Sequence, residues 1–253
     1  VVSVQDLLKS AQSTGNISGA AAVVVADMIS GIRGALGTPV ENISASSVFL
    51  VSMLPDDSGS IRSSGNEQLV RDGHNMVIEA LRESKQAGGI LAHCKYLNGT
   101  ILYPFTLIDQ AVFMDANNYQ ATGTTPLYDE TITILGTVAL KTQEFEDSGV
   151  PVSTATLIVT DGADYRSQRS IHDARKVVED MLRQERHIVA AMGISDGSTD
   201  FEDVFTKMGI PKEWILTPGN TKSDIRKAFG CFSRSAVRAS QGVSKSQLGG
   251  FAA

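Results

Sequence analysis

Short apolar runs alternate with amphipathic stretches through most of the chain, and this alternation constrains the fold more than any other feature. Residues 47–55 and 153–160 have the length and composition of buried strands, whereas residues 66–86 repeat apolar side chains at helical spacing. Strands that alternate with helices are typical of a mostly parallel sheet with helices on both faces, so we expect a doubly wound α/β fold. The other predicted strands are 89–97, 101–107, 186–194 and 213–218, and the other predicted helices are 125–146, 170–185, 199–209 and 221–240.

One strand of the sheet is expected to be antiparallel. The turn residues Asn98-Gly99-Thr100 join two neighbouring strand segments and predict a hairpin, which places the strand 101–107 at an edge. In parallel sheets ligands bind beyond the carboxyl ends of the strands. Two of those ends carry acidic residues: Asp56 and Asp57 follow the first strand, and Asp161 follows the strand 153–160.

The predicted sheet does not account for the two ends of the chain. We expect residues 1–43 to be a helical extension with a linker, residues 44–240 to be the α/β domain, and residues 241–253 to be a flexible Gly- and Ser-rich tail. Within the extension, the apolar density of 20–32 indicates burial, either inside the chain or against a partner. Ser or Thr residues with an acid three positions later predict helix caps at Ser3, Ser170, Thr199 and Thr221.

Charge and cysteine content exclude several classes of protein. A net charge of −6 and a pI near 5.2 argue against binding to nucleic acid or to anionic membranes. The apolar run 20–25 is too short to span a membrane, and with no basic segment before it we do not expect a signal peptide. Cys94 and Cys231 stand far apart, which favours two separate thiols in a reducing compartment over a disulfide framework.

The stretch 54–66, "LPDDSGSIRSSGN", is open to several interpretations. A tight turn that caps the next helix is one of them. A phosphoryl-receiving pocket would need a further Asp after the strand 89–97, where Asn98 stands, and a phosphatase nucleophile pair would need Asp at Ser58. A calcium loop that starts at Asp56 would need Gly at Ile61.

A metal site of mixed oxygens is the remaining interpretation. Asp56, Ser58 and Ser60 alternate along the loop, and Mg²⁺ prefers about six oxygen ligands, some of them from water. One loop cannot supply enough of them. The sequence offers further oxygens at the turn 121–129 and at the strand end 157–164.

Three segments together resemble the von Willebrand factor A domain family and its metal ion-dependent adhesion site. They are the Asp-x-Ser-x-Ser motif of 56–60, the Gly-Thr-Thr-Pro-Leu motif of 123–127, and the strand-end motif Ile-Val-Thr-Asp-Gly of 158–162. The resemblance extends over residues 44–240 and implies a Rossmann-like fold. Two features depart from the family pattern: Pro55 predicts that the first strand ends one residue early, and Thr124 competes with Thr125, which we prefer because it directly precedes Pro-Leu.

The resemblance also implies a function. Ser58, Ser60 and Thr125 would contact a divalent cation through their hydroxyls, with Asp56 and Asp161 holding the ion or its waters. Mg²⁺ or Mn²⁺ is expected in preference to Ca²⁺, and an acidic residue of a protein partner would complete the coordination. Bacterial intracellular members imply a cytoplasmic, non-enzymatic binding module, with no nucleic acid and no membrane span, that acts in a multiprotein assembly with an ATPase.

Two other functions stay open on the sequence alone. One is a metal-dependent hydrolase or phosphate-handling enzyme on a similar scaffold, and the other is a fold whose metal site is vestigial and whose role is structural. In the segment after Asp161, the candidate partner-binding residues are Asp164, Tyr165, Arg166 and Arg169. Asp57 falls in the variable slot of the motif, so we predict that it matters less for metal binding than Asp56.

Overall fold

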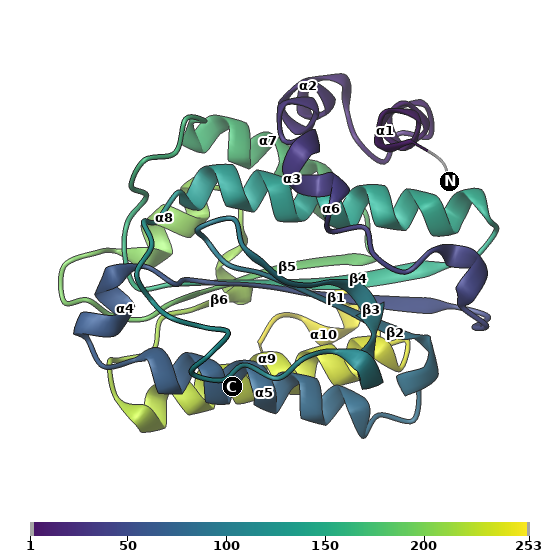
Figure 1. Ribbon diagram of the computed structural model, residues 1–253. Helices are drawn as coiled ribbons and strands as arrows, with labels where there is room; N and C mark the ends of the chain where they lie inside the picture. Colours follow the sequence, from purple (N-terminus) through teal and green to yellow (C-terminus); the bar gives the residue numbers. More distant parts are fainter. Residues whose placement is uncertain (1–2, 252–253) are drawn as a thin grey trace.

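A mostly parallel sheet forms the centre of the molecule, with helices on both faces (Figure 1). The computed structural model describes residues 3–251. The sheet has six strands in the order β3-β2-β1-β4-β5-β6, and only β3 is antiparallel to its neighbour, which confirms the expected fold class. The strands are β1 (Val48–Pro55), β2 (Ile90–Lys95), β3 (Ile101–Leu107), β4 (Val152–Thr160), β5 (His187–Gly193) and β6 (Ile215–Leu216).

Helices cover the sheet from above and below in Figure 1. The helices α6 (Leu127–Asp147), α7 (Ile171–Leu182) and α8 (Phe201–Lys207) lie on the upper face. On the lower face lie α5 (Glu67–Arg82), α9 (Lys222–Ser240) and α10 (Lys245–Leu248), and the short helix α4 (Gly59–Ser63) precedes α5. Among the described residues, no helix is both long enough and apolar enough to cross a membrane.

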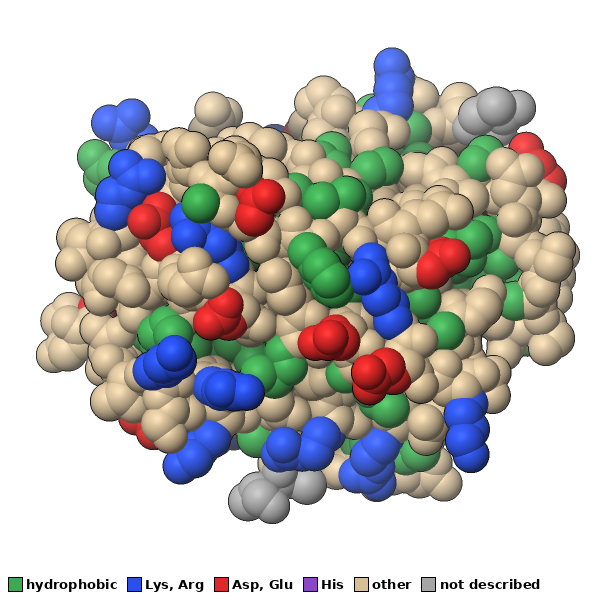
Figure 2. All heavy atoms as spheres, turned by 60° about the horizontal axis from the view of Figure 1, so that its bottom comes forward, with side chains coloured by type: hydrophobic (Ala, Val, Ile, Leu, Met, Phe, Trp, Pro, Cys, Tyr) green, Lys and Arg blue, Asp and Glu red, His purple; other side chains and the backbone are tan. Residues whose placement is uncertain are grey.

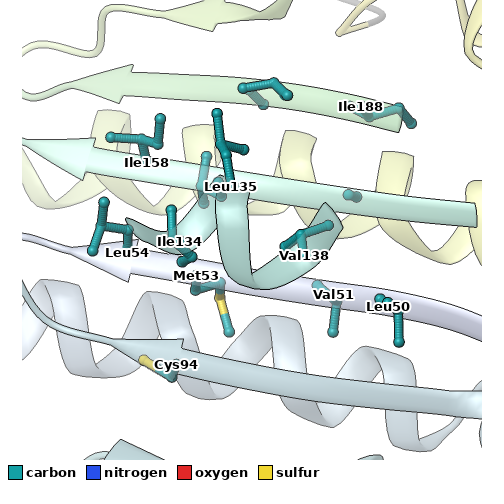
Figure 3. Packing of buried hydrophobic residues seen from close by; sticks show 14 of the residues in the cluster. Leu50, Val51, Met53, Leu54, Cys94, Ile134, Leu135, Val138, Ile158 and Ile188 are labelled. Atoms are coloured by element: carbon teal, nitrogen blue, oxygen red, sulfur yellow. The ribbon is translucent and has the colours of Figure 1, made fainter. Parts of the chain in front are cut away.

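The main core lies between the sheet and α6. Figure 3 shows side chains of β1, β2, β4 and β5 next to those of α6, and all of them are buried. Strands buried on both faces are continuous apolar runs rather than alternating ones, which is why β1 and β4 were recognisable in the sequence.

Three N-terminal helices form an additional layer above α6 and α7 (Figure 1). They are α1 (Val4–Ser13), α2 (Gly19–Asp27) and α3 (Ile29–Arg33). Their apolar side chains join the same core cluster as the sheet, so the extension packs within its own chain. As a consequence α6 is covered on both sides, and even its polar residues Thr131, Thr137 and Lys141 are buried.

The linker after α3 covers the outer edge of β3. The amide of Phe105 donates to the carbonyl of Ala35 (2.9 Å), and the amide of Thr38 donates to the carbonyl of Phe105 (2.7 Å). Gly37 lies between them with φ +63°, and a Cβ there would be 2.0 Å from the Phe105 carbonyl oxygen. Glycine is therefore required where the linker pairs with this edge.

The structure corrects the prediction for the end of the first strand. Pro55 does not shorten β1, which pairs with β4 as far as Pro55–Val159, and the amide of Asp56 continues the ladder to Val159. The carbonyl of Pro55 points towards the other neighbour, where it accepts from Leu97. The missing N–H faces the same side, so it does not interrupt the pairing of β1 with β4.

Three further predictions differ from the structure in detail. The apolar segment 20–32 is not one continuous helix, because it breaks at Met28 and its glycine-containing second half forms only the short α3. The cap of α8 is Asp200, which accepts from the amide of Asp203, rather than Thr199. Within residues 241–251, for which a flexible tail is predicted, the short helix α10 carries its own capping box and Phe251 packs edge-on against Trp214. Residues 252–253 lie outside the described part of the chain.

Candidate metal centre

The acidic strand ends meet at the point where the order of the strands reverses. The chain leaves β1 for β2 on one side and returns to β4 on the other, so β1 and β4 are neighbours although they are far apart in sequence. Their register pairs Pro55 with Val159. Asp56 and Asp161, which follow these strands, are therefore brought together at the carboxyl edge, where doubly wound folds bind ligands.

Asp56 is fully buried and held by several hydrogen bonds. Its Oδ1 accepts from the amide of Ser58 (2.7 Å), and its Oδ2 accepts from the hydroxyl of Thr160 (2.6 Å). The hydroxyl of Tyr119 donates to its carbonyl. The carboxylate is thus fixed in one orientation before any ion binds, which is the usual task of residues around a metal ligand.

Ser58, Ser60 and Asp161 form a continuous chain of oxygens. The Oγ atoms of the two serines lie 2.8 Å apart, and the Ser60 hydroxyl donates to Asp161 Oδ1 over 2.6 Å. Asp161 Oδ2 is buried and has no hydrogen-bond partner among the described residues. A buried carboxylate oxygen without a donor is unfavourable, so this atom points to a cation as its missing partner.

Thr125 lies on a neighbouring loop that pairs with the first loop of the site. Ser58 and Gly123 form an isolated parallel bridge, in which the amide of Gly123 donates to the Asp57 carbonyl (2.8 Å) and the amide of Gly59 donates to the Gly123 carbonyl (3.2 Å). Thr125 itself is buried. Its rival Thr124 is only half-buried, which agrees with the choice of Thr125 but does not test it.

Asp57 has contacts of its own, away from the chain of hydroxyls. Its Oδ1 accepts from the amide of Asn98 after β2 (3.0 Å), and its Oδ2 is buried without a partner among the described residues. Burial raises the pKa of Asp57 to about 7. Asp57 therefore fastens the loop to the end of β2, in keeping with its place in the variable slot of the motif.

Burial also sets the charge state of the two candidate ligands. It raises the pKa of Asp161 to about 6 and also raises the pKa of Asp56, in spite of the hydrogen bonds that these groups accept. Loss of hydration disfavours the charged form of a carboxyl group unless an opposite charge lies nearby. A divalent cation would supply that charge.

The residues present fit a hard divalent cation. The proposed donors are two carboxylates and three hydroxyls, all of them oxygens of the kind that Mg²⁺ and Mn²⁺ prefer. No group of three or more His, Cys, Asp or Glu side chains with a metal-binding arrangement occurs among the described residues. A site of the proposed kind relies on hydroxyls, so it does not need such a group.

The segment after Asp161 contains residues of two kinds. Asp164 accepts from the amide of Tyr128 (3.2 Å) and from the hydroxyl of Ser167, and Arg169 pairs with Asp27 of α2. These two candidate partner-binding residues thus have partners within the chain. Tyr165 and Arg166 project outward instead, with Tyr165 58% exposed and the Arg166 guanidinium over its ring.

Arg166 has an unusual backbone. Its φ of 77° is the only positive φ of a non-glycine residue in the part of the chain that the structure describes. The amide of Tyr165 donates to the carbonyl of Thr125 (2.7 Å), which ties this turn to the second loop of the site. Strained backbone of this kind is concentrated at functional sites.

Sequence reasoning missed three residues that position the site. Thr160 holds Asp56, Tyr119 holds the carbonyl of Asp56, and Asn98 holds Asp57. Thr160 stands directly before Asp161, so the pairing of β1 with β4 could have revealed it. Tyr119 lies in an irregular segment far from the motifs, and no sequence signal connects it to the site.

Comparisons with known proteins agree with this geometry. The sequence matches no protein-family model, and no curated protein matches it at a significant level. Solved structures do match: proximal thread matrix protein 1 of the mussel byssus has a TM-score of 0.53 at 17% identity, over 76% of this chain and 48% of that one. A second structure of the mussel protein, with a TM-score of 0.50 and 15% identity over 76% of this chain and 46% of that one, has a zinc-occupied MIDAS motif, the metal ion-dependent adhesion site.

Two bacterial pilus proteins are also similar. The adhesin SpaC of Lactobacillus rhamnosus GG has a TM-score of 0.55 at 11% identity, over 77% of this chain and 30% of that one. The vWF domain of the tip protein Mfa5 of Porphyromonas gingivalis has a TM-score of 0.50 at 9% identity, over 76% of this chain and 96% of that one. The chain thus spans about half of the mussel protein and less than a third of SpaC, but nearly all of the Mfa5 domain. The chain has the fold of a von Willebrand factor A domain.

Proposed function

We propose that this chain is a protein-binding module that depends on a divalent cation. Asp56, Ser58, Ser60, Thr125 and Asp161 would hold Mg²⁺ or Mn²⁺, and a carboxylate from a partner protein would complete the coordination. The bound ion would supply an electrophilic position for that carboxylate. The residues of the chain would orient the ion and keep water away from most of its surroundings.

The observation that carries the proposal is the unpartnered Oδ2 of Asp161. It is buried beside the two serine hydroxyls, and Asp56 is already fixed next to it. A vestigial site would be expected to fill this position with a donor or an apolar side chain, since an unpaired buried carboxylate oxygen destabilises the fold. The zinc-occupied motif of the structurally similar mussel protein adds support.

The surface beside the site suits a protein ligand. Two carboxylates would balance the charge of a divalent ion, so an additional carboxylate from outside would meet no net negative charge and could bind at an open coordination position of the ion. Exposed Tyr165 and Arg166 follow Asp161 by four and five positions in sequence, and Tyr and Arg are enriched at the centres of protein interfaces. We propose that these two residues contact the partner, whereas Asp164 and Arg169 position the turn that carries them.

Three of the four histidines do not favour the hydrolase alternative. His74, His93 and His187 are buried in the core, where burial lowers their pKa to about 4, 4 and 3. Each is hydrogen-bonded there, to Tyr103 Oη, to the Tyr103 carbonyl and to Thr154 respectively. None of these three is available as a general base for a metal-bound water, so we propose a binding rather than a catalytic role.

The cellular setting is part of the proposal. Cys94 and Cys231 are free thiols, and Cys94 is buried on β2, which supports a reducing compartment such as the bacterial cytoplasm. An assembly that contains an ATPase is the partner class that the family resemblance implies. Capture of partners on the immobilised chain, with Mg²⁺ or with chelator, tests this part of the proposal.

Metal binding itself is tested by adding Mn²⁺ or Mg²⁺ to protein from which metal has been removed with a chelator. Calorimetry measures the binding, and the melting temperature measures its effect on stability. We expect a stabilising shift that grows with metal concentration, because only the folded state offers the site. Asp161→Ala should remove the shift. Asp109→Ala is the matched control, because this exposed carboxyl follows the end of β3, which pairs with the start of β2 at the opposite end of the sheet from the site.

Two results would count against the proposal. One is a melting temperature that does not respond to millimolar Mn²⁺, and the other is an equal response in the wild type and in Asp161→Ala. If metal binds but partner capture is indifferent to chelator and to Asp161→Ala, the site is a metal site without a role in partner binding.

A further inference from the structure

Helices α5 and α9 lie side by side on the face opposite the N-terminal helices, and they run in the same direction. A Cβ on Gly73 would lie 2.2 Å from the ring of Phe229, and further along Ser84 Oγ lies 3.3 Å from Ser240 Oγ. The two contacts join residues at the same separation in sequence. Each residue of α5 therefore lies at the same height along the shared helix direction as one particular residue of α9, which we call its level on α9.

The two helices expose rows of opposite charge. Figure 2 shows Lys and Arg side chains gathered along the lower part of this face, with acidic side chains above them. The basic row of α9 is Lys222, Arg226, Lys227, Arg234 and Arg238, and the acidic row of α5 is Asp72, Glu79 and the C-cap residue Glu83. Within the described part of the chain, none of these residues forms an ion pair within 4.0 Å.

A shallow groove separates the two rows. It consists of two adjoining hollows of about 310 and 620 Å³, which share Met76 and Arg226. Half-buried Leu69, Met76, Gly230 and Cys231 line its floor. The face thus has an apolar seam between a basic and an acidic wall, which is the usual anatomy of a small interface with a polar rim.

The charge pattern selects the kind of partner. A purely acidic ligand would be attracted by α9 and repelled by α5, and a purely basic ligand would meet the reverse. A partner that carries both rows at the same spacing satisfies both walls. We propose that this face associates with the same face of a second copy of the chain, about a two-fold axis that runs along the groove.

The levels of the two helices fit this symmetry. A two-fold axis parallel to the helices lays α5 of one copy over α9 of the other without changing the level of any residue. From the contacts above, Glu79 lies level with the position after Arg234, and Glu83 lies level with the position after Arg238. Glu79 and Glu83 therefore each meet an arginine of the other copy, and each pair occurs twice, as an isologous interface requires.

The size of the face predicts the strength of the association. The 16 residues of α5 span ~24 Å, and two helices side by side are ~20 Å wide. The two copies together would bury on the order of 1,000 Å², at the low end for specific complexes. The dimer should be weak, and it should depend on salt because its charges are exposed.

Sedimentation analysis of the full chain up to millimolar concentration tests the proposal, with and without chelator. We expect dimers in about 0.01 M salt, where charges act over ~30 Å, and mostly monomers in about 1 M salt. Arg234→Glu and Glu79→Arg should each weaken association at least ~10-fold, because each reversal turns two attractions into repulsions. Lys9→Glu on α1 is the matched control and should leave the dimer unchanged.

Mixing the two variants gives the decisive result. Equal amounts of Arg234→Glu and Glu79→Arg should form a mixed dimer, because every glutamate then meets an arginine again. A wild type that stays monomeric in low salt, reversals without effect, or a mixture that fails to associate would each overturn the proposal. If either variant is misfolded by circular dichroism, Arg238→Glu and Glu83→Arg replace the pair, with the same expected outcomes.

Discussion

At the scale of single residues, Asp56 and Asp57 are adjacent in sequence but have different environments. Asp56 accepts from the Ser58 amide and the Thr160 hydroxyl at the candidate site, whereas Asp57 accepts from Asn98 and keeps one buried oxygen without a partner among the described residues. The contrast follows from the alternation of side chains along an extended segment. It separates a residue that would contact the ion from one that supports the loop.

Replacement of Asp57 by Asn should change how stability depends on pH. The pKa of Asp57 is about 7 in the folded protein and 3.8 as its ordinary value, so the folded state binds the extra proton between these values. Its contribution to the free energy of unfolding therefore falls as pH rises through this window, by up to about 1.4 kcal/mol per pH unit. In metal-free protein, Asp57→Asn should gain stability relative to wild type from about pH 4 to about pH 7.

Urea unfolding of both proteins across this pH range measures the difference, and Mn²⁺ titration at pH 7 adds a second readout. Asp57→Asn should retain much more metal affinity than Asp56→Asn. Equal loss of metal binding in both variants would show that the register of the motif is wrong, and parallel pH curves would show that Asp57 is ionised normally.

The sequence was most informative about those site residues that form a motif within one loop or that directly follow a recognisable strand. The spacing of Asp56, Ser58 and Ser60 identified the first loop, and Asp161 could be placed because an apolar strand ends directly before it. Thr160 and Tyr119 escaped notice because their contacts join segments that meet only in the folded chain. The parallel pairing of β1 with β4 creates the first of these contacts.

At the scale of elements, the packing of α5 on α9 depends on one glycine. Gly73 is buried, and a Cβ would lie 2.2 Å from a ring carbon of Phe229, which is also buried. Gly73→Ala should destabilise the fold by about 1–3 kcal/mol, since overpacking outweighs the higher helix propensity of alanine. Chemical denaturation measures the loss.

Gly88→Ala is the control for this substitution, because nothing lies within 4 Å of the Cβ position and the φ of Gly88 is not left-handed. It should change stability by less than about 0.5 kcal/mol. A Gly73→Ala variant as stable as this control would mean that the two helices can separate without cost.

Element types were easier to predict than element boundaries. Most of the strands and helices of the domain follow the apolar periodicity, but β1 extends through Pro55, and the residues after 240 form α10. Both departures depend on tertiary context: the side to which the missing N–H points, and the pocket beside Trp214 into which Phe251 packs. Local patterns contain neither piece of information.

At the scale of the whole molecule, the N-terminal layer belongs to the core of the domain. Ile32 is fully buried against Gly136 of α6, whereas Val23 on α2 is 67% exposed. Ile32→Ala should lower the free energy of unfolding by about 2–5 kcal/mol, and Val23→Ala should change it by less than about 0.5 kcal/mol. Thermal unfolding followed by circular dichroism compares the two.

A single cooperative transition that shifts as a whole in Ile32→Ala is expected if the layer and the sheet unfold together. An early separate transition would instead identify the layer as an independent unit. The sequence could not decide this, because α2 is apolar on nearly every side and its pattern does not show which face is covered.

The shared direction of α5 and α9 has a consequence for binding strength. Both helices run opposite to β1, and α5 begins soon after the loop 56–60 of the candidate metal centre. A two-fold axis along the helices therefore leaves both candidate metal centres at the same end of a dimer. Two modules with their candidate metal centres at the same end would bind a repetitive or surface-bound partner at the same time. The second contact would then form at a high effective concentration. The overall affinity of the dimer would exceed that of a single module by about 10²–10⁴-fold, even if each module binds weakly.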